Sequence, residues 1–467
     1  MDRTHLVTLR SFSKEMDADT VPPMTTNSMR VLLRGVNLIV HALQTLVKVA
    51  LCSCLVSLWT WNCLAQDLQK QADKAIENED YKKAVVILEK MVGVNPSNAE
   101  AWYSLGHAIH WMCYDSVPLK GYDRSLSDRI LSCMNKALGL NPNLRDCYSV
   151  IGSEYGARAE YSLQNNDWSE FTSNLKSAWR ARAIPPWLLE YSRNLLNSCG
   201  QNAILFTGGD AEVFPVWYCQ YVDSIRTDVI LCPIPLLDRP WFAKLLKTGF
   251  AGHIAAVPLA WSGEQLGEMH IAKWQTQNVE LAIPPTLRRK FGIKDSVFSW
   301  VLPPDIQRDG RGYLGINRII LLGLIQANNW ERPVHFSMGC HPWMFSNLND
   351  HLRYCGMTLE LVPISANVGK RSINLSTTMN LIEDSTNFSC LTSLKDQDIP
   401  YVSSILQNYR LVYLRACDSL LQAGKMQPAR VLLTAMDTCL PDSILPTPAG
   451  LRNMVADLRR KASVSKP

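Results

Sequence analysis

The sequence predicts an α plus α/β protein: helical hairpins, then an α/β domain with a mostly parallel sheet, then a C-terminal helical hairpin. Two changes of hydrophobic pattern along the 467 residues lead to this prediction. Small and apolar residues recur at helical spacing up to about Gly200, and short apolar runs between glycines and prolines follow. Helical spacing then returns near the end of the chain. Short strands that alternate with helices are typical of a parallel sheet.

These changes divide the chain into four segments. Residues 1–65 form a leader, 66–200 a helical domain, 201–400 the α/β domain, and 401–467 the C-terminal helical hairpin and tail. At about 150 residues per domain, the length suits about three domains with a sizeable core.

Composition excludes several classes of protein. Charged residues make up only 19% of the chain and hydrophobic residues 47%, which excludes a disordered chain. The net charge is +5 and no run of five like charges occurs, so nothing favours nucleic-acid binding. The mean hydropathy of −0.05 excludes a polytopic membrane protein.

The leader contains a candidate secretory signal. Residues 49–65 carry no charge, follow a lysine and end with Cys63 and Ala65, the small residues expected before a cleavage site. Three alternatives stay open: an uncleaved single-pass anchor within residues 31–65, a lipid attached at Cys54, and a buried helix. The prediction is a non-cytoplasmic, cell-envelope protein that is secreted, periplasmic or membrane-anchored.

Cysteine usage does not settle the compartment. Three of the fourteen cysteines lie in the leader, and the other eleven form no CxxC pair. We expect most of them to be buried small hydrophobes, with room for one or two bridges.

The helical domain reads as repeated helix pairs. Ala84, Leu88 and Met91 follow one another at helical spacing before a stop at Pro96. Pro142 ends the next unit 46 residues later, so that unit carries about twelve extra residues, placed between Cys113 and Leu126.

These units resemble the tetratricopeptide repeat. The second opens with Trp102-x-x-Leu105-Gly106 and the third with Tyr148-x-x-Ile151-Gly152. The resemblance implies a concave groove for a peptide or protein, shaped in part by Trp102 and Tyr148. The alternative is a helical scaffold that only packs on the next domain.

The α/β domain opens with a strand, a helix and a strand. Ala203–Thr207, Val213–Ile225 and Val229–Pro233 have the patterns of these elements, and a right-handed crossover makes the two strands parallel. Further elements are predicted as a strand at His253–Pro258, a helix at Ile316–Asn328, a strand at Arg332–Ser337, a helix at Met344–Cys355 and a strand at Thr358–Pro363. The stretch Trp261–Arg311 is expected to be an insertion or lid over the sheet edge.

The strongest candidate for a ligand site follows the first of these strands. Open α/β sheets bind ligands at the carboxyl ends of their strands, and helix amides there favour an anion or a sugar hydroxyl. The alternative is that Asp210 is only a helix N-cap and the glycines a tight turn. The residues predicted to bind are Thr207, Gly208, Gly209, Asp210, Phe214 and Trp217.

Other chemistry has weaker support. Cys340, His341, His351 and Cys355 could be drawn as a zinc site, with the last two on one helix, but their spacing fits no compact motif, so no metal is predicted. Dinucleotide, phosphate-loop and hydrolase motifs are absent, so no cofactor is expected and catalytic residues stay unknown. The charged residues Arg226 with Asp228 and Glu331 with Arg332 are expected to pair structurally or to stay solvated. The tryptophans could stack on sugars, but most are expected in the core.

Several blocks of the chain carry a resemblance to a known family. They are residues 203–218 with 226–229, residues 328–336, and Asn408-Tyr409-Arg410 before a last helix pair. Together they resemble the non-membrane C-terminal tail of bacterial membrane proteins related to protein O-mannosyltransferases, from about Ile204 to Pro441. Family members carry many membrane spans and a catalytic carboxylate between them. No acidic residue of this chain matches that position, and His335 replaces a usual aromatic.

The sequence therefore supports three hypotheses. The first is a non-catalytic interaction or acceptor-binding module of an envelope glycosylation system, which implies a protein partner such as a multi-span membrane glycosyltransferase and a glycan or peptide ligand. The second is a glycan- or lipid-sugar-processing enzyme with its site at Asp210. The third is a purely structural repeat scaffold.

Overall fold

The computed structural model describes residues 66–114, 123–365, 372–394 and 399–463, with a few residues between 35 and 48. The predicted leader signal and most of the predicted insert between Cys113 and Leu126 lie outside this part of the chain. No helix within the described residues is both long and apolar enough to cross a membrane. Contacts divide the chain into two compact units, 1–96 and 97–467, which are described separately.

The first unit contains a helix pair, as predicted. Residues 66–77 are helical, and α2 (Tyr81–Val94) follows after a short turn. The Asp80 carboxylate caps α2 by accepting a hydrogen bond from the Lys83 amide at 3.2 Å. The side chains at the predicted helical spacing are buried: Ala72, Ala75, Ala84, Leu88 and Met91.

The second unit opens with antiparallel helix pairs, which confirms the predicted helical hairpins. Asp123 and Asp167 cap the second helix of each pair. Small residues let the helices approach: a Cβ added at Gly106 would lie 2.6 Å from Met134 Cε of the facing helix. The helices are α3 (Ala99–Tyr114), α4 (Arg124–Leu140), α5 (Asp146–Gln164) and α6 (Trp168–Arg180), followed by α7 (Pro186–Asn197).

A five-stranded mixed sheet forms the centre of this unit, in the order β2-β1-β8-β10-β9. β1 is parallel to both of its neighbours, and the last two strands are antiparallel. The α plus α/β class is thus confirmed, but the sheet is mixed and not mostly parallel: of its four strand pairs, β1–β2 and β1–β8 are parallel and β8–β10 and β10–β9 are antiparallel. The strands are β1 (Ile204–Thr207), β2 (Ile230–Pro233), β8 (Val334–Ser337), β9 (Leu352–Cys355) and β10 (Thr358–Leu361).

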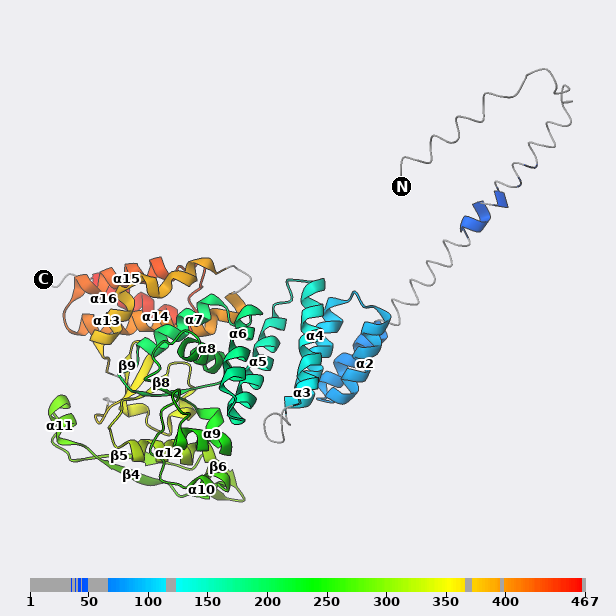
Figure 1. The fold of residues 1–467 in the computed structure, drawn as a ribbon. Helices are drawn as coiled ribbons and strands as arrows, with labels where there is room; N and C mark the ends of the chain where they lie inside the picture. Colours follow the sequence, from blue (N-terminus) through cyan, green and yellow to red (C-terminus); the bar gives the residue numbers. More distant parts are fainter. Residues whose placement is uncertain are drawn as a thin grey trace, which may run out of the picture. The chain divides into compact units, whose positions relative to one another are not determined.

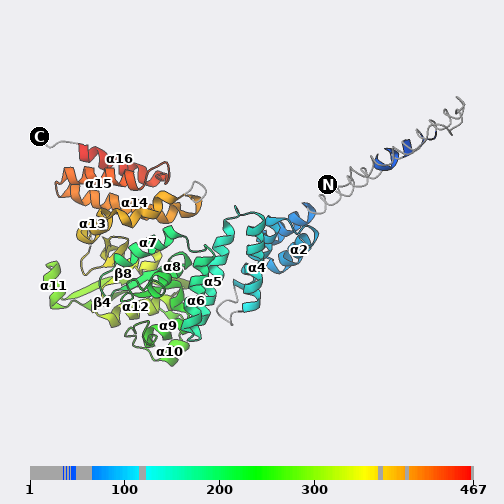
Figure 2. The same ribbon diagram turned by 45° about the horizontal axis from the view of Figure 1, so that its top comes forward.

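Helices cover both faces of this sheet. The helix α8 (Asp210–Tyr221) links β1 to β2 and lies with α7 on one face, whereas α12 (Ile316–Asn328) and α9 (Pro240–Thr248) lie on the other (Figures 1 and 2). α12 packs on the short helix η2 (Ile234–Asp238), which follows β2.

Three helices end the chain where a hairpin was predicted. They are α14 (Ile399–Gln422), α15 (Met426–Cys439) and α16 (Ala449–Ser463), and each packs against the other two. The helices α13 (Leu375–Glu383) and η5 (Ser385–Ser393) connect them to the sheet. Figures 1 and 2 show this layer beyond α7, on the side of the sheet that α8 covers.

The predicted insertion is an elaborated segment with two small sheets. A hairpin pairs β4 (Gln277–Ala282) with β5 (Val297–Leu302), and a three-stranded sheet has the order β3-β7-β6. Its remaining elements are α10 (Gly263–Gly267), β3 (Ala272–Lys273), α11 (Pro285–Phe291), β6 (Ile306–Arg308) and β7 (Arg311–Leu314).

Two predicted elements are wrong. The segment predicted as a helix at Met344–Cys355 forms the short helices η3 (Pro342–Phe345) and η4 (Asn349–His351) and then β9. Ser346 and Asn347 have positive φ there, which no continuous helix allows. The segment His253–Pro258 forms only an isolated bridge between Phe250 and Ile254, because glycines with positive φ make a tight turn before it.

The packing of α5 on α8 gives a first prediction. A Cβ at Gly156 of α5 would overlap the Phe214 ring of α8. We therefore expect Gly156→Ala to lower the free energy of unfolding by about 1–3 kcal/mol, measured by chemical denaturation.

Gly139 provides the matched control, because a Cβ there meets nothing within 4 Å. Gly139→Ala should stabilise α4 by about 0.5–1 kcal/mol, since alanine is the better helix former. If both variants had the same stability, the close contact of α5 and α8 would be contradicted.

Candidate functional site

The topology of the sheet points to one edge as the candidate site. The chain leaves β1 for β2 on one side and later returns to β8 on the other. The carboxyl ends of β1 and β8 therefore form a topological switch point, where open α/β sheets bind ligands. The predicted residues Thr207 to Asp210 lie there, together with Met338 and Gly339, which follow β8. We call this place the switch-point edge.

A buried carboxylate occupies the switch-point edge. Glu212, in the first turn of α8, accepts hydrogen bonds from the Gly208 amide at 3.2 Å and from the Ser337 hydroxyl. The Gly339 amide donates to the same hydroxyl at 2.9 Å, and a side chain at Gly339 would overlap the Glu212 carboxylate. Burial raises the pKa of Glu212. Because the Glu212 carboxylate already accepts hydrogen bonds from these donors, the buried part of the switch-point edge disfavours an anionic ligand.

Thr207 ends β1 beside this carboxylate. Its side chain is fully buried, and its hydroxyl has no hydrogen-bond partner among the described residues. Continuing the register of β1 with β8 places Thr207 beside Ser337, and alternation along the strands puts both side chains on the face that α8 covers. A buried hydroxyl of this kind is unusual, since most buried polar groups are paired.

The other predicted residues of this site have different roles. Asp210 is the first residue of α8, and Gly209 holds the N-cap position, so the interpretation of Asp210 as the cap is wrong. Phe214 and Trp217 are buried in the core, and Trp217 meets Phe171 of α6 edge-on at 5.5 Å. Both side chains anchor α8 in the hydrophobic core.

A second group of charged and titratable side chains lies around Asp210, away from the buried Glu212. Asp210 is exposed on one side, but the surrounding protein raises the pKa of its carboxyl, while His110 of α3 lowers it. Burial, and after it the Asp210 charge, raise the pKa of Glu160 of α5 to about 8, against the opposing effect of Arg239. The Glu160 carboxyl of α5 thus interacts electrostatically with the Asp210 carboxyl of α8 and with the Arg239 guanidinium at the start of α9.

The predicted groove residues lie on the helices next to this group. Trp102 of α3 and Tyr148 of α5 are both half-buried. The two helices pack together, and His110 Nδ1 lies 2.7 Å from Glu154 Oε1 across their interface. Whether Trp102 and Tyr148 contact a partner stays a prediction.

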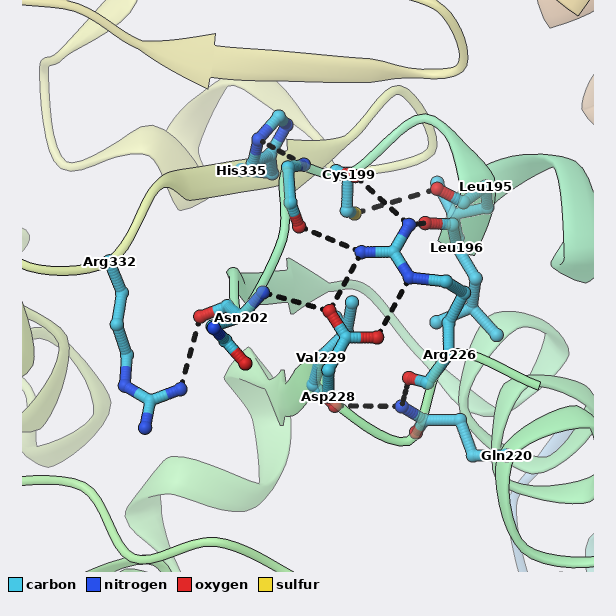
Figure 3. A network of polar contacts seen from close by, with 11 residues as sticks. Leu195, Leu196, Cys199, Asn202, Gln220, Arg226, Asp228, Val229, Arg332 and His335 are labelled. Carbon is cyan, nitrogen blue, oxygen red and sulfur yellow. Dashed lines mark hydrogen bonds and ion pairs between the residues drawn. The ribbon is translucent and has the colours of Figure 1, made fainter. Parts of the chain in front are cut away.

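The opposite edge of the sheet is held by a structural network (Figure 3). The Arg226 guanidinium donates to both oxygens of Asp228 at 2.8 and 2.9 Å and to the carbonyls of Leu196, Cys199 and Gly200 at 2.8–3.0 Å. Arg226 lowers the pKa of Asp228. The predicted structural pairing of Arg226 with Asp228 is confirmed. Arg332, the other predicted member of such a pair, donates to the Asn202 carbonyl at 3.1 Å.

His335 belongs to this structural edge too. Its Nε2 accepts the Gly200 amide at 3.2 Å, and its Nδ1 lies 2.8 Å from the Thr358 hydroxyl, which donates to the Cys355 carbonyl. Both contacts suit a neutral ring protonated at Nδ1. Burial lowers the pKa of His335 to about 4, which agrees with this assignment.

The residues considered for zinc do not come together. No group of three or more potential metal ligands occurs in the part of the chain that the structure describes. Cys340 donates to the Phe206 carbonyl and Cys355 to the Ser198 carbonyl, while His351 faces the Ile364 carbonyl at 3.3 Å. The helix that would have aligned His351 with Cys355 does not exist. The eleven cysteines after the leader are free thiols.

Sequence reasoning missed three side chains of the edge. Glu212 could have been found, because it lies two residues after Asp210, in the first turn of the helix that follows the strand. Ser337 could have been found as the end of the strand predicted at Arg332–Ser337. Nothing in the sequence links Glu160 to this place, because α5 reaches it only through tertiary packing.

Part of this unit resembles a known family. Residues 189–307 and 304–380 match the family described as TMEM260-associated domain 2. The match runs from α7 into α13, so it includes the sheet, the switch-point edge and the Arg226 network, in less than half of the chain. It is consistent with the resemblance to an O-mannosyltransferase-like tail. No curated protein matches the chain.

The raised pKa of Glu160 gives a prediction with a definite sign. A carboxyl whose folded pKa lies above its unfolded value of about 4.3 stabilises the fold fully at low pH. That stability is lost as the pH rises toward about 8. Glu160→Gln keeps the neutral form at every pH. We expect its free energy of unfolding relative to the wild type to rise by on the order of 1–3 kcal/mol between pH 5 and pH 8.

The measurement is urea denaturation of both proteins across this range. Glu280 of β4 is exposed, so Glu280→Gln is the control and should follow the wild-type profile. A difference between Glu160→Gln and the wild type that stays constant with pH would show that Glu160 ionises normally.

Proposed function

We propose that this protein is a non-catalytic interaction or acceptor-binding module of a protein-glycosylation system of the O-mannosyltransferase-like type. The observation that carries the proposal is the match of residues 189–380 to a TMEM260-associated domain. The resemblance of the same segment to the non-membrane tail of membrane transferases supports it. The proposed partner is a multi-span membrane glycosyltransferase, in the cell envelope outside the cytoplasm.

The arrangement of the second unit suits a binding module. α5 and α6 both pack on α8, so the helical hairpins adjoin the helix that starts at the switch-point edge. A ligand on the exposed side of α3 and α5 would therefore lie close to Asp210 and Glu160. The tetratricopeptide-like character of these helices, which the resemblance implies, supports a peptide or glycan as the ligand.

The buried part of the switch-point edge, at Glu212, favours binding over catalysis. The Glu212 carboxylate is engaged with Ser337 and Gly208 and is closed off by Gly339. A carboxyl used in this way stabilises the loops of the edge and has no position left from which to reach a substrate. The carboxyls that a ligand could reach are those of Asp210 and Glu160, away from Glu212.

Affinity purification of the tagged full-length chain from its own detergent-solubilised membranes tests this proposal. We expect a multi-span glycosyltransferase to be enriched, identified by mass spectrometry after chemical crosslinking. A tagged exported protein of similar size is the control. Recovery of the chain alone in the soluble fraction would overturn the proposal.

One observation favours a second candidate, a glycan- or lipid-sugar-processing enzyme. Glu160 and Asp210 come from different helices, and both carboxyls have a raised pKa. Such pairs supply the acid of glycosidic chemistry, because a carboxyl that stays protonated near neutral pH can donate its proton.

Asp210→Asn separates this candidate from the first. If the protein is an enzyme, turnover of a glycan or lipid-linked sugar should disappear while the melting temperature stays within a few degrees, because Asp210 makes no cap bond. Unchanged turnover would exclude this role for Asp210. A protein whose melting temperature no glycan, peptide or lipid-linked sugar raises would instead fit the structural scaffold.

A further inference from the structure

The β4–β5 hairpin ends in a connection that we call the basic tip, residues 284–295, which includes α11. Four basic groups and one acidic group give the basic tip a net charge of +3, whereas the whole chain of 467 residues has only +5. Positive charge is therefore concentrated at this place. The charged side chains of the basic tip are Arg288, Arg289, Lys290, Lys294 and Asp295.

The basic tip lies at the margin of the second unit. Figures 1 and 2 show α11 at the far end of the hairpin, apart from the helices that cover the central sheet, and none of its residues is buried. The Phe291 ring lies 5.2 Å from the guanidinium carbon of Arg353 of β9, and Arg353 pairs with Glu360 of β10 at 2.8 Å. The basic tip is therefore held against the sheet on one side and open to solvent on the other.

The cations of the basic tip are available to a partner. Arg289, Lys290 and Lys294 are exposed, and their side chains form no ion pair or hydrogen bond among the described residues. The Lys290 ammonium lies 5.5 Å from the centroid of the Phe291 ring. Basic residues in the last turn of a helix complement its dipole, which accounts for Arg289 and Lys290. Lys294 lies beyond the helix, so the dipole explains only part of this charge.

Apolar side chains lie on the hairpin beside the basic tip. Val297 is 46% exposed and pairs with Ala282, which is also exposed, at the end of the hairpin next to α11. Val301 is 47% exposed on the same face of β5, four residues along the strand. The hairpin thus presents apolar groups to solvent close to its cations.

An anionic bilayer suits this surface better than other polyanions do. A nucleic acid needs a basic stripe that follows a row of phosphates, and the basic tip is too short for one. An acidic peptide is recognised by side chains that are fixed in place, whereas the exposed cations here have no hydrogen bond that fixes them. Lipid headgroups are mobile and form an extended surface, which flexible cations on a tip can reach together. Clusters of about four to eight lysines and arginines are typical of such contacts.

We propose that the basic tip docks the second unit on the surface of a bilayer rich in anionic lipids. Arg289, Lys290 and Lys294 bind the lipid phosphates, and Val297 contacts the interfacial region beside them. Leu287 and the other large aliphatic residue of the tip pack against the protein core, so the contact is at headgroup level and depends on charge. This inference goes beyond the proposed function and does not rest on it, because its partner is lipid.

The test measures binding of the full-length chain to vesicles by co-sedimentation. Vesicles of phosphatidylcholine alone are compared with vesicles that contain about one third phosphatidylglycerol. We expect tighter binding to the anionic vesicles, weakened on the order of a hundredfold in Arg289→Gln/Lys290→Gln/Lys294→Gln, about fivefold for each cation removed. Arg289→Lys/Lys290→Arg/Lys294→Arg keeps the charges and should bind as the wild type does. Salt at about 1 M should abolish the preference, since it screens charges beyond about 3 Å.

Lys82→Gln/Lys83→Gln/Lys90→Gln is the matched control, because it removes the same charge from exposed positions of α2. It should bind anionic vesicles as the wild type does. All the proteins keep the leader, so differences between them report on the substituted surface, and their melting temperatures show that they fold.

The proposal is overturned if both kinds of vesicle bind equally, if the glutamine variant of the basic tip binds as tightly as the wild type, or if the charge-keeping variant loses binding. Binding of duplex DNA or of a polyaspartate peptide through the basic tip, without binding to vesicles, would also overturn it. The affinity purification of a transferase uses detergent in place of a bilayer, so its outcome is independent of this test.

Discussion

The α/β unit depends on one guanidinium, that of Arg226. The chain must leave α7 and enter β1 at a fixed place, although the carbonyls at the end of that helix have no partners within the helix. Arg226 donates to the Leu196 carbonyl in the last turn of α7 and to the Cys199 and Gly200 carbonyls in the connection that follows. The paired Asp228 accepts the Asn202 amide at 2.8 Å (Figure 3). These contacts hold the residues before β1 against the residues before β2. They therefore fix the register of the two strands, and with it the relative positions of their carboxyl ends.

The switch-point edge uses a charge in a corresponding way. Glu212 reaches back from α8 to the loops after β1 and β8, and Gly339 is small enough to let it pass. Each edge of the parallel strands is therefore held by one charged side chain that binds backbone amides or carbonyls, the buried Glu212 at one and the part-buried Arg226 at the other. The match to the TMEM260-associated domain includes both side chains. We take them to be the framework of the domain, on which surface chemistry is then placed.

Much of this fold could be predicted from the sequence. The patterns around Ala203–Pro233 and Ile316–Ser337 gave the right elements and the parallel pairing, because glycines and prolines there separate short apolar runs from helices. The segment 344–355 failed, because its hydrophobic residues also suit a helix and only the positive φ of Ser346 and Asn347 reveals the break. The strand end before Asp210 was predicted as a ligand site, which stays a prediction, and Glu160 and Arg239 could not be joined to it from the sequence. Their placement depends on how α5, α8 and α9 pack in three dimensions.

The separation of framework from surface bears on what the edge can do. Substrate chemistry needs a group that can change its protonation or move, whereas Glu212 is fixed by three neighbours and is needed for the fold. Burial and the charges of Asp210 and Arg239 act on the pKa of Glu160, whereas burial and His110 act on the pKa of Asp210. A ligand that donates hydroxyls to these carboxyls would favour their ionised forms and shift their pKa values back toward normal, because hydrogen bonds to a charged form stabilise it. A ligand bound through such hydrogen bonds would therefore cause these carboxyls to release protons.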